Sequence, residues 1–434
     1  MPKIKKINFA LLGLGKLGTG IYELWQQKRD AIHKETGWDL HLKKILVKNI
    51  KFRRSSVIDK SLLTSRLDDI LEDDSIKIAI DAIGGIEPTF SIIKKLINNK
   101  INIISANRTL LASKMHELIK LANTNKTYIM PEPSLGGGVP IISTLQRDLV
   151  ANKIKSLTGI LSGTSNYILS EMSDKKCSLK EVLQQRNLQK MSESLSIIDY
   201  EGSDAAQKVS ILAASSFSVY VNYLHIHAEG ISQITPIDIH HAEKFGYEFK
   251  LLAIIKEHEK LFEIRVHPSM VRKGHPLTLV RGEYNAFFME TDLLGNYMLY
   301  GKGVGIEATS SLVLRDIISL SNLIYNTKRR IDYSINSKNK PIMTMDDIKS
   351  SYYVRFTCED KPGVIGQITS IFGDFNINIS SAHAEIDEEF GPENAGYVHI
   401  FIDHAREKDV MLALDKIQQL TIMQNKIKYF RIFP

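Results

Sequence analysis

The sequence predicts an α/β protein with a doubly wound parallel sheet, then an α+β domain, then a small βαββαβ unit. Three observations support this. Strand-like apolar runs alternate with helical patterns over the first 105 residues, proline and glycine become frequent near Pro131, and a new strand–turn–helix order starts at Ser351. A chain of 434 residues suits roughly two to four domains. We predict domains at 1–130 (completed by about 301–325), 131–300 and 351–434, with a linker at 326–350.

The N-terminal part carries the clearest alternation. Apolar runs predict strands at 4–12, 42–47, 76–83 and 101–105, and a periodic pattern predicts a helix at 89–98. The third of these strands is apolar enough to be buried on both faces. Strands that alternate with helices in this way form parallel sheets.

Composition and charge limit the classes of protein. Hydrophobic residues make up 43% and charged residues 24%, and the net charge is +7. The basic residues are spread along the chain without interleaved aromatic residues, so we expect no nucleic-acid partner. We find no signal peptide and no membrane span. The two cysteines, Cys177 and Cys358, lie far apart, which suits a reducing compartment, so we expect a cytoplasmic protein.

A glycine-rich motif follows the first predicted strand and reads Gly13-Leu14-Gly15-Lys16-Leu17-Gly18. Its glycines allow a tight turn and a close approach of the backbone to a pyrophosphate, which then faces the N-terminus of the next helix. The motif alone is weak evidence. Its position between a strand and a helix is the one that this mechanism requires, so we predict a Rossmann-type dinucleotide site at these residues.

The end of the second strand bears on the choice of cofactor. NAD-binding domains place an acidic residue there to bind the ribose hydroxyl. This chain instead carries basic residues, among them Lys48 and Arg53, which favours the 2′-phosphate of NADP. NAD stays possible, because the same residues could form an ordinary solvated loop.

Asp204 and Lys208 open a later helix, after the step Gly202-Ser203. Residues four apart share a helix face, and such a pair is usually a surface ion pair. Here the segment 209–214 is strongly apolar, which predicts a buried helix. A buried lysine must be paired, and burial makes its pKa tunable for proton transfer.

Taken together, the ordered motifs resemble the homoserine dehydrogenase family over about residues 5–325. The resemblance rests on the following segments: 13–18, 83–85, 105–112, 132–140, 159–164, 199–208 and 301–305 with Thr309. The resemblance implies reversible oxidation of L-homoserine to L-aspartate 4-semialdehyde with NAD(P), in the biosynthesis of threonine, methionine and isoleucine.

The resemblance also implies roles for single residues. Lys208 corresponds to the proposed general acid/base, and Asp204 to its carboxylate partner. The other substrate-binding positions are Thr164, Glu193 and Asp199. The remaining cofactor-binding positions are Gly84, Ser105, Arg108, Gly303 and Gly305. A loop with Glu132, Leu135, Gly137 and Val139 resembles one that holds a monovalent cation such as Na⁺, mostly through backbone carbonyls.

Two segments depart from the family pattern. Arg108 replaces a lysine that lies between cofactor and substrate, and arginine is poorly suited to proton transfer. We therefore assign Arg108 an electrostatic role in the catalytic group. The segment 190–196 keeps Glu193 but lacks the usual tyrosine, aspartate and proline. Two alternatives stay open: an oxidoreductase for another small hydroxy or oxo acid, and a catalytically weakened assembly protein.

The C-terminal segment resembles the ACT domain. Asp360-Lys361-Pro362-Gly363 precedes a predicted helix, and Asn376-Ile377-Asn378-Ile379 follows it as a predicted strand, with a hairpin around Gly391-Pro392. Such domains pair through their sheets and bind amino acids, so the resemblance implies a homodimer or homotetramer with L-threonine as effector. A domain that only dimerises is the alternative.

The pair His240-His241 invites a metal-site interpretation. Adjacent residues point apart on a helix, and no carboxylate–histidine spacing accompanies them. We therefore expect both histidines on a helix surface.

Overall fold

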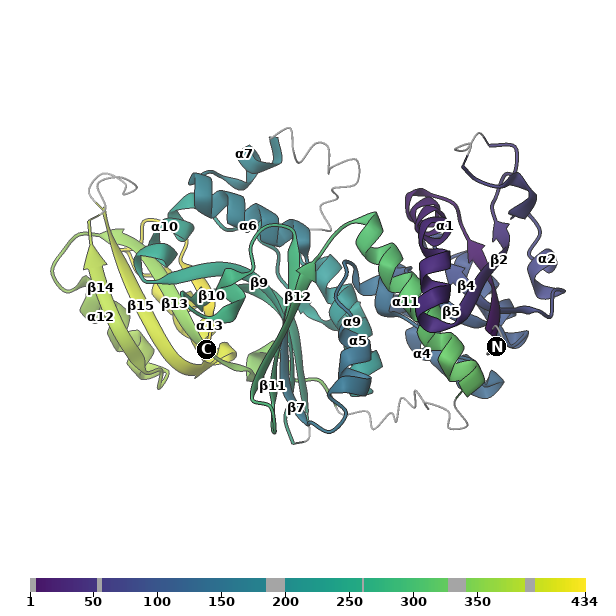
Figure 1. The fold of residues 1–434 in the computed structure, drawn as a ribbon. Coiled ribbons are helices and arrows are strands. Elements are labelled where there is room, and N and C mark those ends of the chain that lie inside the picture. The colour runs from purple at the N-terminus through teal and green to yellow at the C-terminus, as the bar shows by residue number, and fades with distance from the viewer. Residues whose placement is uncertain (1–4, 53–56, 185–199, 260, 327–340, 387–394) are drawn as a thin grey trace. The chain divides into compact units, whose positions relative to one another are not determined.

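The structure is a computed structural model that describes residues 5–52, 57–184, 200–259, 261–326, 341–386 and 395–434. The chain forms two compact units (Figure 1). The first contains Met1–Gly163, Ser203–Ile226 and Glu283–Lys340, and the second contains Thr164–Gly202, His227–Gly282 and Pro341–Pro434. In the part of the chain that is described, no helix is long and apolar enough to span a membrane.

The first unit contains a parallel sheet of six strands in the order β3-β2-β1-β4-β5-β6. Its strands are β1 (Lys5–Leu12), β2 (Trp38–Leu46), β3 (Leu63–Thr64), β4 (Ile76–Asp81), β5 (Asn102–Ser105) and β6 (Ile129–Met130). All five pairings are parallel. The strand order reverses between β1 and β4, and ligands of such sheets bind at the carboxyl ends of the strands beside that point.

The helices of the first unit are α1 (Lys16–Thr36), α2 (Asp68–Leu71), α3 (Thr89–Asn98), α4 (Arg108–Asn125), α5 (Ile141–Ser143), α9 (Ser203–Phe217) and α11 (Ile306–Asn326). Helix α9 packs against α4. Alternate residues of β1, such as Phe9 and Leu11, share one core with Trp25 of α1 and Ile317 of α11. Helix α11 therefore packs with the six-stranded sheet although it begins 176 residues after the last strand, β6. Three antiparallel strands, β7 (Ile154–Ile160), β11 (Tyr284–Thr291) and β12 (Asn296–Lys302), complete the unit.

The second unit is built on a mainly antiparallel sheet, in which β10 pairs in parallel with both β16 and β8. Its main strands are β9 (Tyr247–Glu257), β10 (Phe262–Arg272), β13 (Lys349–Glu359), β14 (Ile379–Glu385), β15 (Ala395–Arg406) and β16 (Lys428–Phe433), and the short β8 (His227–Ala228) pairs with β10. The helices are α6 (Gly163–Lys175), α7 (Leu179–Gln184), α10 (Pro236–Lys244), α12 (Val364–Asp374) and α13 (Glu407–Gln418).

The C-terminal elements follow the predicted order β13-α12-β14-β15-α13-β16, and the predicted fold class is confirmed. Alternate residues of β13, such as Tyr352 and Val354, pack under α12 and α13. Their neighbours Tyr353 and Arg355 point to the other face, where Phe245 and Asp238 of α10 and its C-cap lie.

Most predicted elements lie where the sequence placed them, and the differences are local. Helix α3 coincides with the predicted 89–98. The strand predicted at 376–379 begins only at Ile379, because Asn376 has a φ of +54° and ends the turn after α12. The hairpin around Gly391-Pro392 and residues 327–340 of the predicted linker lie outside the described residues. The domain boundaries stay a prediction.

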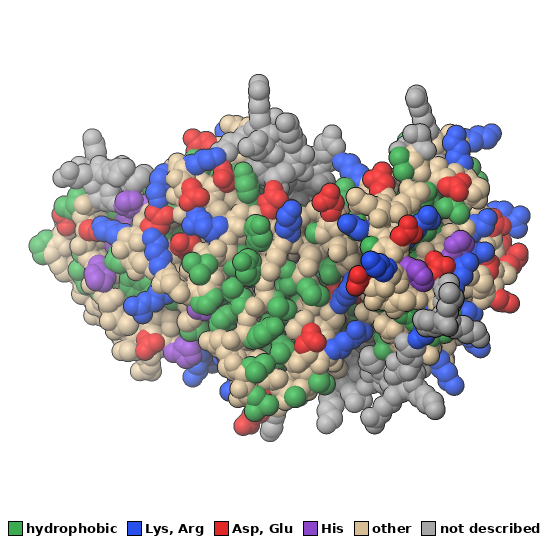
Figure 2. Space-filling view, viewed as in Figure 1, with side chains coloured by type: hydrophobic (Ala, Val, Ile, Leu, Met, Phe, Trp, Pro, Cys, Tyr) green, Lys and Arg blue, Asp and Glu red, His purple; other side chains and the backbone are tan. Residues whose placement is uncertain are grey.

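The visible surface carries charges of both signs. Figure 2 shows Lys and Arg side chains interspersed with Asp and Glu, while hydrophobic side chains gather near β11 and β12. The exposed apolar residues of that hairpin are Tyr284, Leu293, Leu294 and Tyr300.

Candidate active site

The glycine motif forms a tight turn between β1 and α1. Gly13 has a φ of +92°, and its N–H donates to the Leu46 carbonyl at 2.9 Å. A Cβ on Gly18 would lie 2.2 Å from the Gly13 carbonyl oxygen, so the turn excludes any side chain there. Gly15 has no heavy atom within 4 Å of the position of a Cβ. That open space at the start of α1 fits the close approach of a pyrophosphate, so these residues fit a dinucleotide.

The other predicted cofactor residues border the same edge of the sheet. Lys16 and Lys48 are exposed, Lys48 just after β2 and Lys16 at the start of α1. Leu17 is half-buried in the first turn of α1. Gly84 is exposed in the turn after β4. Arg53 lies outside the described residues.

A buried polar group holds the carboxyl ends of β4 and β5 together; it contains the predicted Ser105 and also Asp81, which the sequence analysis missed. Ser105 is fully buried and donates from Oγ to Asp81 Oδ2 at 2.8 Å, and it accepts from the Asn107 N–H at 3.1 Å. The Asn107 amide in turn donates to the Gly85 carbonyl at 2.7 Å. Burial raises the pKa of Asp81 to about 6, although hydrogen bonds from Ser105, the Ile83 N–H and Asn107 act to lower it. Ser105 and Asn107 thus fix the shape of the loop that follows β4. The sequence feature that could have identified Asp81 is an acidic residue at the end of an apolar strand.

The predicted catalytic residues meet in the first unit. Arg108 begins α4, and Asp204 and Lys208 lie on the first turns of α9. Lys208 Nζ lies 2.8 Å from Asp204 Oδ2 and donates to the Leu161 carbonyl at 2.6 Å. The Arg108 guanidinium contacts the other carboxylate oxygen, Oδ1. One carboxylate therefore bridges two cations.

Burial makes this arrangement electrostatically strong. The side chains of Asp204 and Lys208 are each 5% exposed, and that of Arg108 is 33% exposed. Burial alone raises the pKa of Asp204, but the charges of Lys208 and Arg108 outweigh it and hold the pKa below the ordinary value. Asp204 is ionised at neutral pH, so it orients both cations. The Leu161 carbonyl could not be found from residue types, because it is a backbone group.

Two glycine-containing loops pack beside Lys208. A Cβ on Gly137 would lie 2.1 Å from the Lys302 carbonyl oxygen, so only glycine allows the loops to approach this closely. The Gly138 N–H donates to the same carbonyl at 2.8 Å. The position of a Cβ on Gly136 is 3.5 Å from Lys208 Nζ. Gly303 is buried at this contact, whereas Gly305 is exposed.

Glu132, predicted as a cation-site residue, anchors its own loop. Its Oε1 accepts from the Ile142 N–H at 2.7 Å. Its Oε2 accepts from the Ser143 N–H at 2.8 Å and from Arg315 at 2.9 Å. The carboxylate is thus committed to protein donors. Leu135 and Val139 are buried in the same loop, and a cation there would depend on backbone carbonyls.

The predicted substrate-binding residues that the structure describes lie in two different units. Asp204 and Lys208 lie together in the first unit, whereas Thr164 belongs to the second unit, in the first turn of α6. Glu193 and Asp199 lie outside the described residues.

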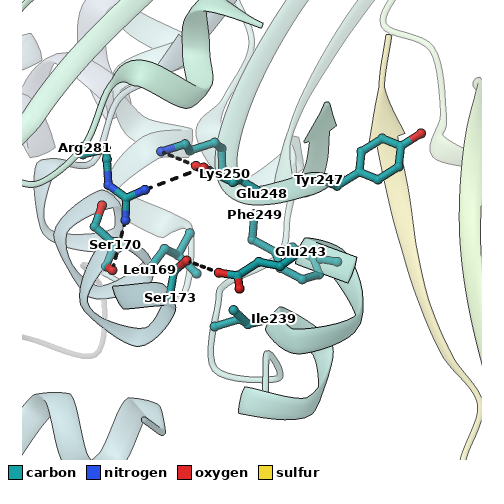
Figure 3. Close-up of a pocket in the computed structure, with 11 residues that line it drawn as sticks. Leu169, Ser170, Ser173, Ile239, Glu243, Tyr247, Glu248, Phe249, Lys250 and Arg281 are labelled. Atoms are coloured by element: carbon teal, nitrogen blue, oxygen red, sulfur yellow. Dashed lines mark hydrogen bonds and ion pairs between the residues drawn. The ribbon is translucent and has the colours of Figure 1, made fainter. Parts of the chain in front are cut away.

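A second buried lysine, in the second unit, provides a comparison. Lys250 is 3% exposed and donates to the Val280 carbonyl at 2.7 Å, and its nearest carboxylate oxygen, on Glu248, is 3.9 Å away. Burial lowers its pKa to about 8. The cavity beside it, drawn in Figure 3, measures about 10 Å³ and is lined by none of the predicted site residues. It is the size of a single water molecule.

Comparisons with known proteins agree along the whole chain. Three family models match: "Homoserine dehydrogenase, NAD binding domain" at residues 13–132, "Homoserine dehydrogenase" at 140–318, and "ACT domain" at 352–421. Homoserine dehydrogenase of Synechocystis sp. is 33% identical, covering 98% of this chain and 99% of its own length. That of Helicobacter pylori is 32% identical, covering 99% of each.

A solved structure gives the same result for the fold. The crystal structure of a homoserine dehydrogenase from Thiobacillus denitrificans has a TM-score of 0.90 and 31% identity, and covers 99% of this chain and 98% of its own. The first domain is therefore a nicotinamide-dinucleotide-binding domain, and the last is an ACT domain. The chain belongs to the homoserine dehydrogenase family and is an oxidoreductase.

Proposed function

We propose that this protein interconverts L-homoserine and L-aspartate 4-semialdehyde through Lys208 and Asp204. The observation that carries the proposal is the buried contact of Lys208 with Asp204, next to the glycine loop at Gly136. As the alcohol is oxidised, Lys208 in its neutral amine form takes up the hydroxyl proton, and in the reverse direction its ammonium form donates a proton to the carbonyl oxygen. Asp204 keeps the lysine oriented, and Arg108 adds a fixed positive charge. A bound nicotinamide cofactor supplies the hydride chemistry.

A spectrophotometric assay of NADP reduction with L-homoserine tests the proposed reaction. We expect turnover with L-homoserine and none with 4-hydroxybutyrate, which has the same hydroxyl group but lacks the amine. Turnover only with another hydroxy acid would favour a related oxidoreductase. If the unmodified protein turns over none of these substrates but still binds the cofactor, a catalytically weakened assembly protein is favoured.

We propose that NADP is preferred to NAD, because Lys48 follows β2 without an acidic neighbour at the expected position. Lys48→Ala should weaken NADP binding by roughly tenfold, since a charged hydrogen bond to phosphate is worth about 1.5 kcal/mol or more, and should leave NAD binding nearly unchanged. Fluorescence titration of both cofactors measures this. Lys34→Ala is the matched control, because Lys34 is an exposed lysine at the far end of α1. Tighter binding of NAD than of NADP by the unmodified protein would contradict the proposal.

We propose that the ACT domain binds L-threonine as an inhibitor. The loop before α12 supports this, because Gly363 has a φ of +88° and no heavy atom within 4 Å of the position of a Cβ. L-Threonine in the millimolar range should lower turnover, and D-threonine should not. A Gly363→Val variant should keep its basal turnover and lose the response. If L-threonine changes neither turnover nor melting temperature, the domain only assembles the protein.

Three further properties stay predictions. The exposed apolar side chains of the β11–β12 hairpin support a homodimer or homotetramer. The monovalent cation would be held by backbone carbonyls of the 132–139 loop. The free cysteines, Cys177 and Cys358, support a cytoplasmic location. The division into domains is likewise retained as we predicted it.

A further inference from the structure

Three potential metal ligands meet in the second unit. The carboxylate oxygen Oε1 of Glu385 lies 3.1 Å from Nε2 of His399 and 3.4 Å from Nδ1 of His241. The three ligand atoms all lie within 4.8 Å of one another. Both imidazoles are fully buried, and the Glu385 side chain is 21% exposed. The expectation that His241 lies on a helix surface is wrong.

The sheet register explains how these residues meet. His383 of β14 lies directly opposite His399 of β15, and Arg355 of β13 lies opposite His399 on its other side. Residues two apart on a strand share a face, so Glu385 and Tyr353 point to the same side. Helix α10 covers this side, and its last turn brings His241 over His399 with ring centroids 4.6 Å apart.

We propose that His241, Glu385 and His399 form a binding site for a divalent transition-metal ion such as Zn²⁺. Zinc binds imidazole nitrogen and carboxylate oxygen at about 2.0–2.2 Å, which at tetrahedral angles separates neighbouring ligand atoms by about 3.3–3.5 Å. The observed 3.1 and 3.4 Å are close to this spacing. Two imidazoles exclude a typical Mg²⁺ or Ca²⁺ site, because those ions prefer oxygen ligands.

The neighbours of the three residues act as a supporting shell. The Tyr353 hydroxyl lies 2.8 Å from Nδ1 of His399, so its oxygen can accept a hydrogen bond from Nδ1–H while Nε2 binds metal. Lys244 contacts the other oxygen of Glu385, Oε2. Such partners orient metal ligands and tune their basicity.

The local charges also permit the site. Arg355 is paired with Asp238 at 2.7 Å, so its charge is largely compensated. Lys244 is 46% exposed and can move toward solvent. Burial lowers the pKa of His241 to about 3 and that of His399 to about 4, with Arg355 contributing. Both imidazoles are therefore neutral at physiological pH, which is the form that binds metal. His240, His383 and Tyr397 are further titratable groups at this face.

Three protein ligands leave a fourth tetrahedral position for water. The ion would join α10 to strands β14 and β15, the first of which begins 135 residues after α10 ends. It lies on the sheet face opposite α12 and α13, whereas the loop before α12 carries the predicted threonine site. We expect the metal to stabilise this packing and not to enter the reaction.

Titration of the chelator-treated, full-length protein with ZnCl₂ tests the site. We expect one equivalent bound by calorimetry and a rise in melting temperature. Co²⁺ in place of Zn²⁺ should give the visible absorption of a tetrahedral site. His241→Asn and Glu385→Gln should abolish the bound equivalent or weaken it by more than a hundredfold. Tyr353→Phe should weaken it by roughly tenfold to a hundredfold, as other supporting residues do.

His240→Asn is the matched control, because His240 precedes His241 on the same helix and is only half-buried. It should bind one equivalent as the unmodified protein does. Glu385 lies at the sheet edge, so its variant remains informative if His241→Asn does not fold. The absence of binding to the unmodified protein, or equal binding by Glu385→Gln, would show that the three residues form only a hydrogen-bonded cluster.

Discussion

Replacing Lys208 by alanine should lower kcat by about a hundredfold or more while NADP still binds. General acid–base catalysis contributes about 10²–10⁴-fold, and Lys208 is the buried group that can exchange a proton beside the glycine loops. The cofactor cradle at Gly13–Gly18 does not contain Lys208, so its affinity should change little. Steady-state kinetics with L-homoserine, together with a fluorescence titration of NADP, measure the two effects separately.

A variant of a second buried lysine, Lys250, controls for the loss of stability that comes from removing a buried ammonium group. Lys250 is as buried as Lys208 and also donates to a backbone carbonyl, but no predicted site residue accompanies it at its cavity. Lys250→Met should change the melting temperature and leave kcat within about a factor of three. If Lys208→Ala keeps near-normal turnover, Lys208 is not the acid/base.

Local patterns predicted the parts of the structure that depend on local physics. The glycine spacing of Gly13–Gly18 predicted the cradle, since a tight turn and an open approach depend on residues close in sequence. The spacing of Asp204 and Lys208 predicted their contact, because both lie on one helix. The apolar segment 209–214 predicted burial, and all its residues are buried.

Contacts between distant segments needed the structure. No spacing in the sequence relates Arg108 to Asp204, which meet only when α4 packs against α9. Asp81 and Ser105 meet because β4 and β5 are parallel neighbours in register. The predicted surface position of His241 was wrong for the same reason. Its neighbours Glu385 and His399 lie on strands β14 and β15, far from His241 in the sequence. Helix periodicity shows which face a residue occupies, but not what covers that face.

Replacing Asp204 by asparagine should lower kcat well below that of the unmodified protein and should also destabilise the fold. The carboxylate bridges Arg108 and Lys208. Its loss leaves a charged Lys208, whose side chain is only 5% exposed, beside the second cation Arg108. Removing one partner of a buried ion pair costs about 3–5 kcal/mol. We expect a loss in kcat of about a hundredfold, since Lys208 is no longer oriented toward substrate. Kinetics and urea unfolding measure the two effects.

The pH dependence of unfolding follows from the lowered pKa of Asp204. A carboxylate with a lowered pKa in the folded state contributes stability above its unfolded pKa, about 3.9, and loses it as pH falls through the folded value. The asparagine variant should therefore be less stable than the unmodified protein at neutral pH, and the difference should shrink in acid below about pH 4. A difference in stability that stays constant down to pH 3 would contradict the role of the bridging carboxylate.

Arg108→Lys separates charge from proton transfer at the same carboxylate. The lysine keeps a positive charge near Asp204 but loses the planar guanidinium, so we expect kcat to stay equal or to fall. Asp204 remains ionised in this variant, because Lys208 still lies 2.8 Å from Oδ2. A tenfold or larger gain in kcat would mean that the residue at position 108 itself takes part in proton transfer. The proton chemistry would then belong to both lysines, and Lys208→Ala in the Arg108→Lys background would retain part of the activity.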